Sequence, residues 1–175
     1  STQLKESGEA IQLFKDSSQV NDPELFTQRI LDRSNELRKD LIKVDLEYEL
    51  MKEVEELIAT DDRMDIASIV PKVAGTDYQT LLEDEVRELT NLMIEKEDAS
   101  YSVTNTNDRI KNLEKSINAK KNGISRTLSS IRDRLNFQRN LLQDQVNNLE
   151  AQLYGIPAVE LKLSQLVSRF DVGEK

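Results

Sequence analysis

The fold of this 175-residue chain is decided by residues 108–154, DRIKNLEKSINAKKNGISRTLSSIRDRLNFQRNLLQDQVNNLEAQLY. Apolar side chains recur there every three or four residues over several heptads, which is the pattern of a coiled coil. The seven-residue register passes through Asn122-Gly123 without a phase slip, so we expect one unbroken helix, roughly 70 Å long at about 1.5 Å per residue. Its predicted seam is Ile110, Ile117, Ile124, Leu128, Ile131, Leu135, Leu142 and Leu149.

A second long helix is predicted over residues 22–60. Asp22-Pro23-Glu24 is a helix start signal: a capping acid, a proline at the first helical position and a carboxylate in the first turn. The predicted seam of this helix, spaced every seven residues, is Ile30, Leu37, Val44, Met51 and Ile58. A second track, four residues after each seam position, is only half apolar because it contains Ser34 and Glu55 beside Leu41 and Tyr48.

Three shorter helices are expected at about residues 4–15, 77–98 and 158–172. Between the helices predicted at 22–60 and 77–98, residues 64–75 carry β-branched side chains on both sides of Pro71 and end at Gly75. That composition predicts an extended connector or edge strand. The fold class is therefore mainly α: an elongated antiparallel helical bundle or coiled-coil hairpin, forming a single domain over residues 1–175.

The composition excludes several kinds of active site. The chain contains no Cys and no His, which leaves no thiol nucleophile, no Ser-His-Asp triad and no zinc site of the usual kind. Its net charge of −9 argues against nucleic-acid binding, which depends on Lys and Arg neutralising phosphates. Charged residues make up 33 % of the chain, as expected for long solvated helices. We therefore expect no catalytic residue, no cofactor and no metal.

Charged residues nevertheless gather at two places. Asp61, Asp62 and Asp65 lack the alternating ligands and turn glycine of a calcium loop, so we interpret them as a solvated helix end. The last long helix is locally basic, which favours charge pairing with Glu47, Glu49, Glu53, Glu55 and Glu56 through flanking positions, the alternative being an anion-binding face. Its basic residues are Lys111, Lys115, Lys120, Lys121, Arg126, Arg132, Arg134 and Arg139.

The last part of the chain, GIPAVELKLSQLVSRFDVGEK (155–175), resembles a stretch of the polysaccharide co-polymerases, or chain-length determinants, and of their tyrosine-kinase-linked relatives. The family stretch reads approximately (L/I)PxxExxxxxLxRxxxVxExLY. Upstream, Ile69-Val70-Pro71 followed by Leu81-Leu82 is similar to the family's helix re-entry, whereas the Asn-Pro often found in the family is replaced by Asn105–Asn107. The residues that carry the resemblance are Ile156, Pro157, Glu160, Leu163, Leu166, Arg169, Phe170, Val172 and Glu174.

This resemblance implies the periplasmic helical region of a bacterial inner-membrane protein whose two spans lie outside the chain. Such proteins form homo-oligomers and control the chain length, polymerisation or export of capsular polysaccharide or exopolysaccharide. Their partners are the polymerase and export machinery, and some relatives carry a cytoplasmic tyrosine kinase. The segment itself would be non-catalytic. The alternative interpretation is a coiled-coil adaptor or tether of a secretion or efflux system, which should carry β-rich flanks around a single hairpin.

Overall fold

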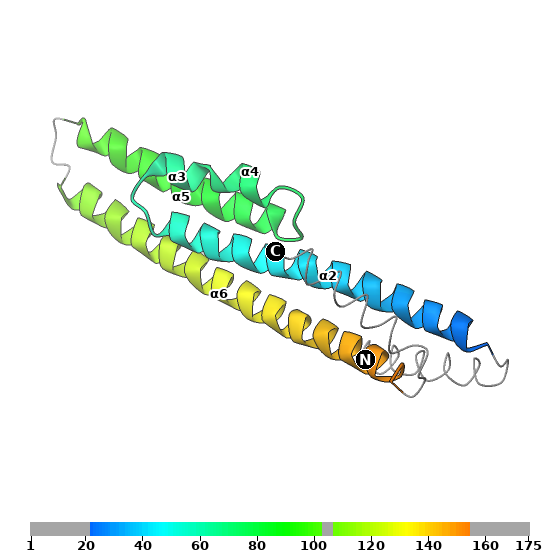
Figure 1. The fold of residues 1–175 in the computed structure, drawn as a ribbon. Helices are drawn as coiled ribbons and strands as arrows, with labels where there is room; N and C mark the ends of the chain where they lie inside the picture. Colours follow the sequence, from blue (N-terminus) through cyan, green and yellow to red (C-terminus); the bar gives the residue numbers. More distant parts are fainter. Residues whose placement is uncertain (1–21, 103–106, 155–175) are drawn as a thin grey trace. The chain divides into compact units, whose positions relative to one another are not determined.

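The computed structural model describes residues 22–102 and 107–154, and all the regular secondary structure in these two ranges is helical (Figure 1). The predicted mainly α class is therefore confirmed. The helices predicted at 4–15 and 158–172 lie outside the described residues. In chain order the elements are α2 (Pro23–Ile58), α3 (Arg63–Ala67), α4 (Ile69–Val73), α5 (Gln79–Ser100) and α6 (Asn107–Ala151).

The chain divides into two compact units, to which the two long helices both contribute. Unit 1 comprises Ser1–Asp45 and Phe137–Lys175, and unit 2 comprises Leu46–Asn136. Unit 1 therefore contains the first part of α2 and the last part of α6. Unit 2 contains the remainder of both helices together with α3, α4 and α5. That the chain forms one domain stays a prediction.

The start of α2 follows the predicted capping signal. An Asp22 side-chain oxygen (Oδ1) accepts a hydrogen bond from the backbone N–H of Leu25 at 3.0 Å. Pro23 is the first helical residue, where its missing N–H leaves no hydrogen bond unmade. The helix then runs for 36 residues, close to the predicted extent, and its last turn contains no basic residue. The cationic partner that usually stabilises a helix C-terminus must therefore come from elsewhere in the chain.

The core of unit 1 lies between α2 and α6. Arg38 pairs with Glu150 and Asp45 pairs with Arg139, so residue numbers rise along α2 as they fall along α6 and the two segments are antiparallel. Leu142 is partly buried against this core, and the buried Ser34 lies on the half-polar track of α2. The core consists of Phe26, Ile30, Leu31, Leu37, Leu41, Val146, Leu149 and Leu153.

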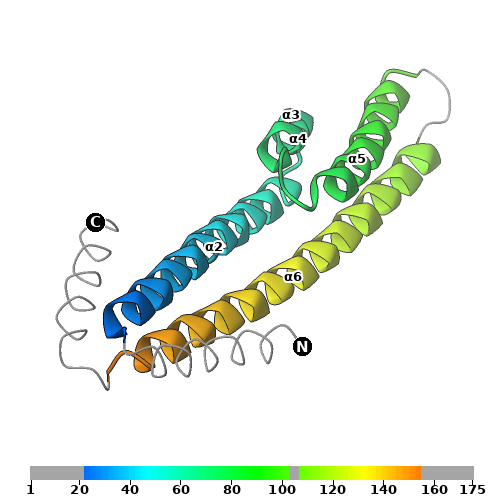
Figure 2. The same ribbon diagram turned by 90° about the vertical axis from the view of Figure 1, so that its right-hand side faces the viewer.

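Unit 2 adds α3, α4 and α5 to the remainder of the two long helices (Figure 2). Within it, α5 and α6 are antiparallel, since Glu85 and Glu88 pair with Lys120 while Lys96 pairs with Glu114. Helix α5 ends at Ser100, two residues later than predicted. Its last turn contains Ala99, which is only 1 % exposed, and burial of this side chain favours continuation of the helix.

The predicted connector or edge strand over residues 64–75 is wrong. This segment forms α3 and α4 instead. Ile66, Ile69 and Val73 are completely buried, and their spacing of three and four residues places them on one helical face. Pro71 lies in the first turn of α4, where backbone N–H groups have no partner within the helix, so the proline is tolerated. Gly75, two residues after the end of α4, has a φ of 84°.

The prediction that α6 continues through Gly123 is confirmed, because Asn107–Ala151 is a single helix. A Cβ added at Gly123 would meet only the Arg126 Nη2 atom, at 3.9 Å, which is ordinary contact. Gly75 is also open to a Cβ, but its positive φ is a conformation that L residues rarely adopt. The two glycines therefore differ in backbone conformation and not in the space around them.

We expect Gly123→Ala and Gly75→Ala to change stability in opposite directions. Gly123→Ala should stabilise unit 2 by roughly 0.5–1 kcal/mol, because alanine loses less backbone entropy in a helix. Gly75→Ala should destabilise it by about 1 kcal/mol, because the left-handed conformation strains an L residue. Urea unfolding followed by circular dichroism measures both. A Gly123→Ala variant less stable than the wild-type chain would contradict the unstrained helix at this position.

Candidate functional site

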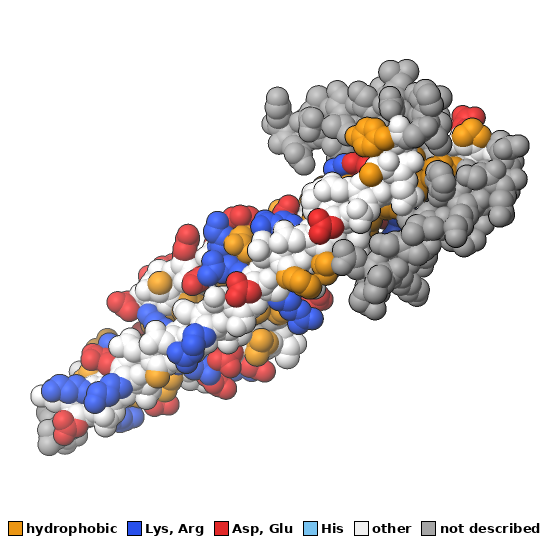
Figure 3. Space-filling model, turned by 90° about the horizontal axis from the view of Figure 1, so that it is seen from below, with side chains coloured by type: hydrophobic (Ala, Val, Ile, Leu, Met, Phe, Trp, Pro, Cys, Tyr) orange, Lys and Arg blue, Asp and Glu red, His pale blue; other side chains and the backbone are white. Residues whose placement is uncertain are grey.

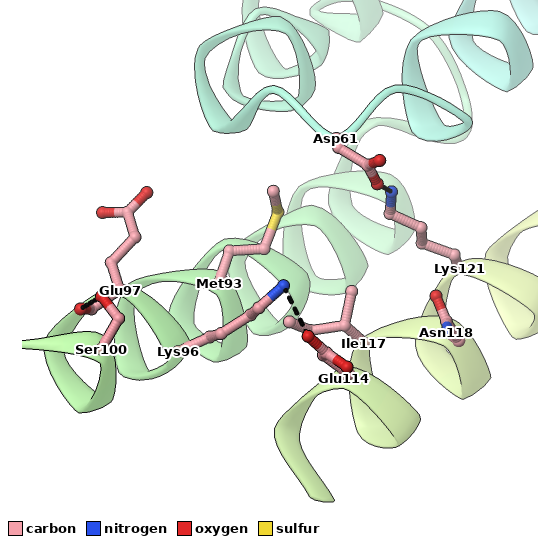
Figure 4. Close-up of a pocket in the computed structure, with 9 residues that line it drawn as sticks. All are labelled: Asp61, Met93, Lys96, Glu97, Ser100, Glu114, Ile117, Asn118 and Lys121. Atoms are coloured by element: carbon pink, nitrogen blue, oxygen red, sulfur yellow. Dashed lines mark hydrogen bonds and ion pairs between the residues drawn. The ribbon is translucent and has the colours of Figure 1, made fainter. Parts of the chain in front are cut away.

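A pocket of about 410 Å³ lies in unit 2 between α5, α6 and the loop that follows α2 (Figure 4). This volume falls in the range of small-molecule sites, about 300–1,000 Å³. Met93 and Ile117 contribute its buried apolar surface, and the remainder of the lining is polar or charged. The lining residues are Asp61, Met93, Lys96, Glu97, Ser100, Glu114, Ile117, Asn118 and Lys121.

The charged side chains of the pocket are paired with one another or with a neighbour. The Lys96 ammonium lies 3.3 Å from a Glu114 carboxylate oxygen, and the Lys121 ammonium lies 3.1 Å from Asp61 (Figure 4). Glu97 accepts a hydrogen bond from Arg63 at 3.2 Å. A charged ligand would therefore have to displace an existing ion pair, so the lining is better suited to holding helices together than to binding an ion.

Lys121 supplies the cation that the end of α2 lacks. Its Nζ donates to the backbone carbonyl of Thr60 at 2.6 Å, just after the last residue of α2, and the side chain is only 12 % exposed. A cation at a helix C-terminus is favoured by the helix dipole and by the unsatisfied carbonyls. The same ammonium hydrogen-bonds to Asp61 and holds the pKa of that carboxyl below its usual value. This pair is therefore intact at neutral pH and is lost as the pH falls through the lowered pKa.

Lys120, the preceding residue, pairs with α5. Its ammonium lies 2.8 Å from a Glu85 carboxylate oxygen and also contacts Glu88. Hydrogen bonds to Glu85 and Glu88 raise the pKa of Lys120 above its usual value. The stabilisation is thus fully present below the usual lysine pKa and is lost as the pH rises through the raised value. At neutral pH Lys120 is therefore charged and paired.

The basic residues of α6 pair with acids of α2 as well as with the acids of α5 already described. Arg132 lies 2.8 Å from Glu55 in unit 2, and Arg139 lies 3.4 Å from Asp45 in unit 1, as charge pairing between the long helices requires. Glu53 instead pairs with Lys72 of α4. Figure 3 shows acidic and basic side chains interspersed over the face that it presents. The favoured charge pairing is thus seen at Glu55, and the alternative of an anion-binding face is not supported at Arg132 and Arg139, which already pair with acids.

Of the three aspartates, Asp61 and Asp62 follow α2 and have separate structural roles, whereas Asp65 lies within α3. Asp61 is exposed and pairs with Lys121. Asp62 caps α3, since its side-chain oxygen accepts from the backbone N–H groups of Met64 and Asp65. The cap could have been found from the sequence, because an aspartate before a short helix is a preferred N-cap. Among residues 22–102 and 107–154, no three potential metal-ligating side chains come together.

The predicted seams lie mostly in the interior of the two units. Along α2 and α6 the seam residues are buried, except for Val44, Ile110 and Leu142, which are half-buried. On the half-polar track, Ser34 and Leu41 are buried while Tyr48 and Glu55 are half-buried. The family-motif positions from Ile156 to Glu174 lie outside the described residues.

No helix within the described ranges is long and apolar enough to cross a membrane. Compared with known proteins, the chain matches no family model, and neither a curated protein nor a solved structure is significantly similar to it.

Proposed function

We propose that this chain is a non-catalytic helical module in the periplasmic region of a polysaccharide co-polymerase. The observation that carries the proposal is the sequence of residues 155–175, in which Pro157, Glu160 and Leu166 take the places of the family motif. The parent protein would be anchored in the inner membrane and would control the length or export of capsular polysaccharide or exopolysaccharide. Helical self-association would be its mode of action.

The described helices support a mechanical role better than a chemical one. The pocket of unit 2 is lined by charges that already pair, and Ser100 donates its hydroxyl proton to the carbonyl of Glu97 in its own helix. General acid–base chemistry needs a group whose pKa lies near the working pH and which reaches a substrate proton. The resolved pKa shifts of Asp61 and Lys120 both favour the charged form at neutral pH. The paired charges and the direction of these two pKa shifts therefore support a scaffolding role.

We expect deletion of the gene to shift the length distribution of the surface polysaccharide or to abolish its export. Complementation should succeed with the complete wild-type gene and with the same gene carrying Leu46→Asp, since Leu46 is 67 % exposed. It should fail with Ile124→Asp, because Ile124 is completely buried and an unpaired buried charge is costly. Size-exclusion chromatography of the extracted polysaccharide gives the measurement. Unchanged polymer together with a defect in secretion or efflux would contradict the proposal and favour the adaptor.

A further inference from the structure

Two adjacent lysines of α6 hold different parts of unit 2. Lys120 contacts Glu85 and Glu88 of α5, whereas Lys121 contacts the Thr60 carbonyl and Asp61 at the end of α2. We propose that Lys120 and Lys121 form a two-armed electrostatic clamp, in which one turn of α6 holds both α5 and the end of α2, and that rising ionic strength releases the α5 arm first. This inference does not depend on the proposed function.

The arm toward α5 is partly exposed to solvent, so dissolved salt can screen it. The Lys120 side chain is 21 % exposed, and its two carboxylate partners are 30 % and 63 % exposed. Interactions between partly exposed ions are weak and are screened by salt. This arm therefore consists of charge-assisted hydrogen bonds and Coulombic attraction to two partly exposed carboxylates.

The arm toward α2 is less accessible and has a different chemical basis. Lys121 is the more buried of the two lysines, and its shorter contact is to a backbone carbonyl rather than to a carboxylate. A charge-assisted hydrogen bond that also compensates the end of a helix resists screening better than an exposed pair of ions. Its second contact, to Asp61, is fully exposed and is screened readily. Salt should thus weaken the contact with Asp61 and leave the hydrogen bond to the Thr60 carbonyl.

The clamp brackets the elements that the sequence places between α2 and α6. The segment from Asp61 to Ser102 contains α3, α4 and α5, and the two arms act near its beginning and on its longest helix. Lys121 and Asp61 also line the pocket. Release of the arms would loosen α5 and the pocket wall while the completely buried Ile124 and Leu128 still hold α6 in the core. The clamp is therefore a salt-responsive device within one unit.

Native-state hydrogen exchange on the full chain tests this proposal. Exchange would be followed at about 0.01 M and about 1 M NaCl, between which the Debye length falls from about 30 Å to about 3 Å. In the wild-type chain, amides around Glu85–Glu88 should exchange about two- to fivefold faster at high salt, whereas those at Ala59 and Thr60 should change less. Equal acceleration at both places would contradict the ordering of the arms.

Single variants separate the arms. Lys120→Gln should accelerate exchange in α5 at low salt and abolish the salt response there, while leaving the end of α2 as in the wild-type chain. Lys121→Gln should accelerate exchange at Ala59 and Thr60 by about tenfold, as expected for loss of a charge-assisted hydrogen bond, and Lys121→Arg should restore most of the protection.

The matched control is Lys72→Gln, which removes the exposed pair between Lys72 of α4 and Glu53 of α2. It should leave both arms and their salt responses unchanged. Amides near Leu128 report whether each variant keeps its core. The clamp is refuted if Lys120→Gln retains the full salt response of α5, or if Lys72→Gln alters both arms as strongly as the lysine variants of α6 do.

Discussion

Leu128→Ala is expected to destabilise the protein by about 2–5 kcal/mol. Leu128 is completely buried on the predicted seam of α6, and truncation of such a side chain loses its transfer free energy and leaves a cavity. Much of the stability of an average domain, about 5–15 kcal/mol, would be lost. Urea unfolding followed by circular dichroism should therefore show a large fall in the midpoint of the transition.

The matched control for this variant is Leu46→Ala. Leu46 is also helical and apolar but lies 67 % exposed, so its truncation should change stability by no more than about 0.5 kcal/mol. Equal effects of the two substitutions would show that the seam of α6 is not the buried face of the helix. Both residues belong to unit 2, so the comparison is made within one compact unit.

The second large effect is expected at the polar cluster of unit 1. Glu150 accepts hydrogen bonds from both Arg38 and the buried Ser34, and its side chain is only 16 % exposed. Arg38→Met would leave a largely buried carboxylate with one fewer cationic partner, which should cost about 2 kcal/mol. The variant Arg38→Met/Glu150→Gln should recover part of this loss, because the amide oxygen still accepts from Ser34 and no buried charge is left.

The contrast between buried and exposed ion pairs provides the control. Arg87 pairs with Asp84 on α5 at 3.3 Å, but both side chains are about 60 % exposed or more. Arg87→Met should therefore change the free energy of unfolding by less than about 0.5 kcal/mol. Thermal unfolding of the variants at two salt concentrations measures the difference. If Arg87→Met and Arg38→Met have equal effects, burial of Glu150 is not what makes its pair important.

Local sequence rules were sufficient where the interaction is local. The cap at Asp22 forms within one turn of α2, and the register through Gly123 repeats within α6, so each can be predicted from residues a few positions apart. The same rules were wrong over residues 64–75. There the β-branched residues and Pro71 suggested an extended chain, but burial of Ile66, Ile69 and Val73 made short helices favourable.

The candidate site was less predictable than the fold, because its contacts join residues far apart in the sequence. The sequence indicated that α6 is basic and that acids lie elsewhere, but not which acid each lysine contacts. Lys120 and Lys121 are neighbours in the chain, yet their partners are at Glu85 and Glu88 in one direction and at Thr60 and Asp61 in the other. Helical periodicity separates their directions by about 100°, and only packing decides what lies there.

The sequence by itself determined the two long helices and most of their buried faces, because the 3-4 spacing of apolar side chains is a property of one helix and can be recognised without its partner. The tertiary structure decided which side chains pair with the charged helix faces and which donor caps the end of α2. The end of α2 has no basic residue of its own and is capped by Lys121, which is 61 positions further along the chain from Thr60. The physical reason is that an orphan carbonyl accepts from whichever donor packing brings within hydrogen-bond distance.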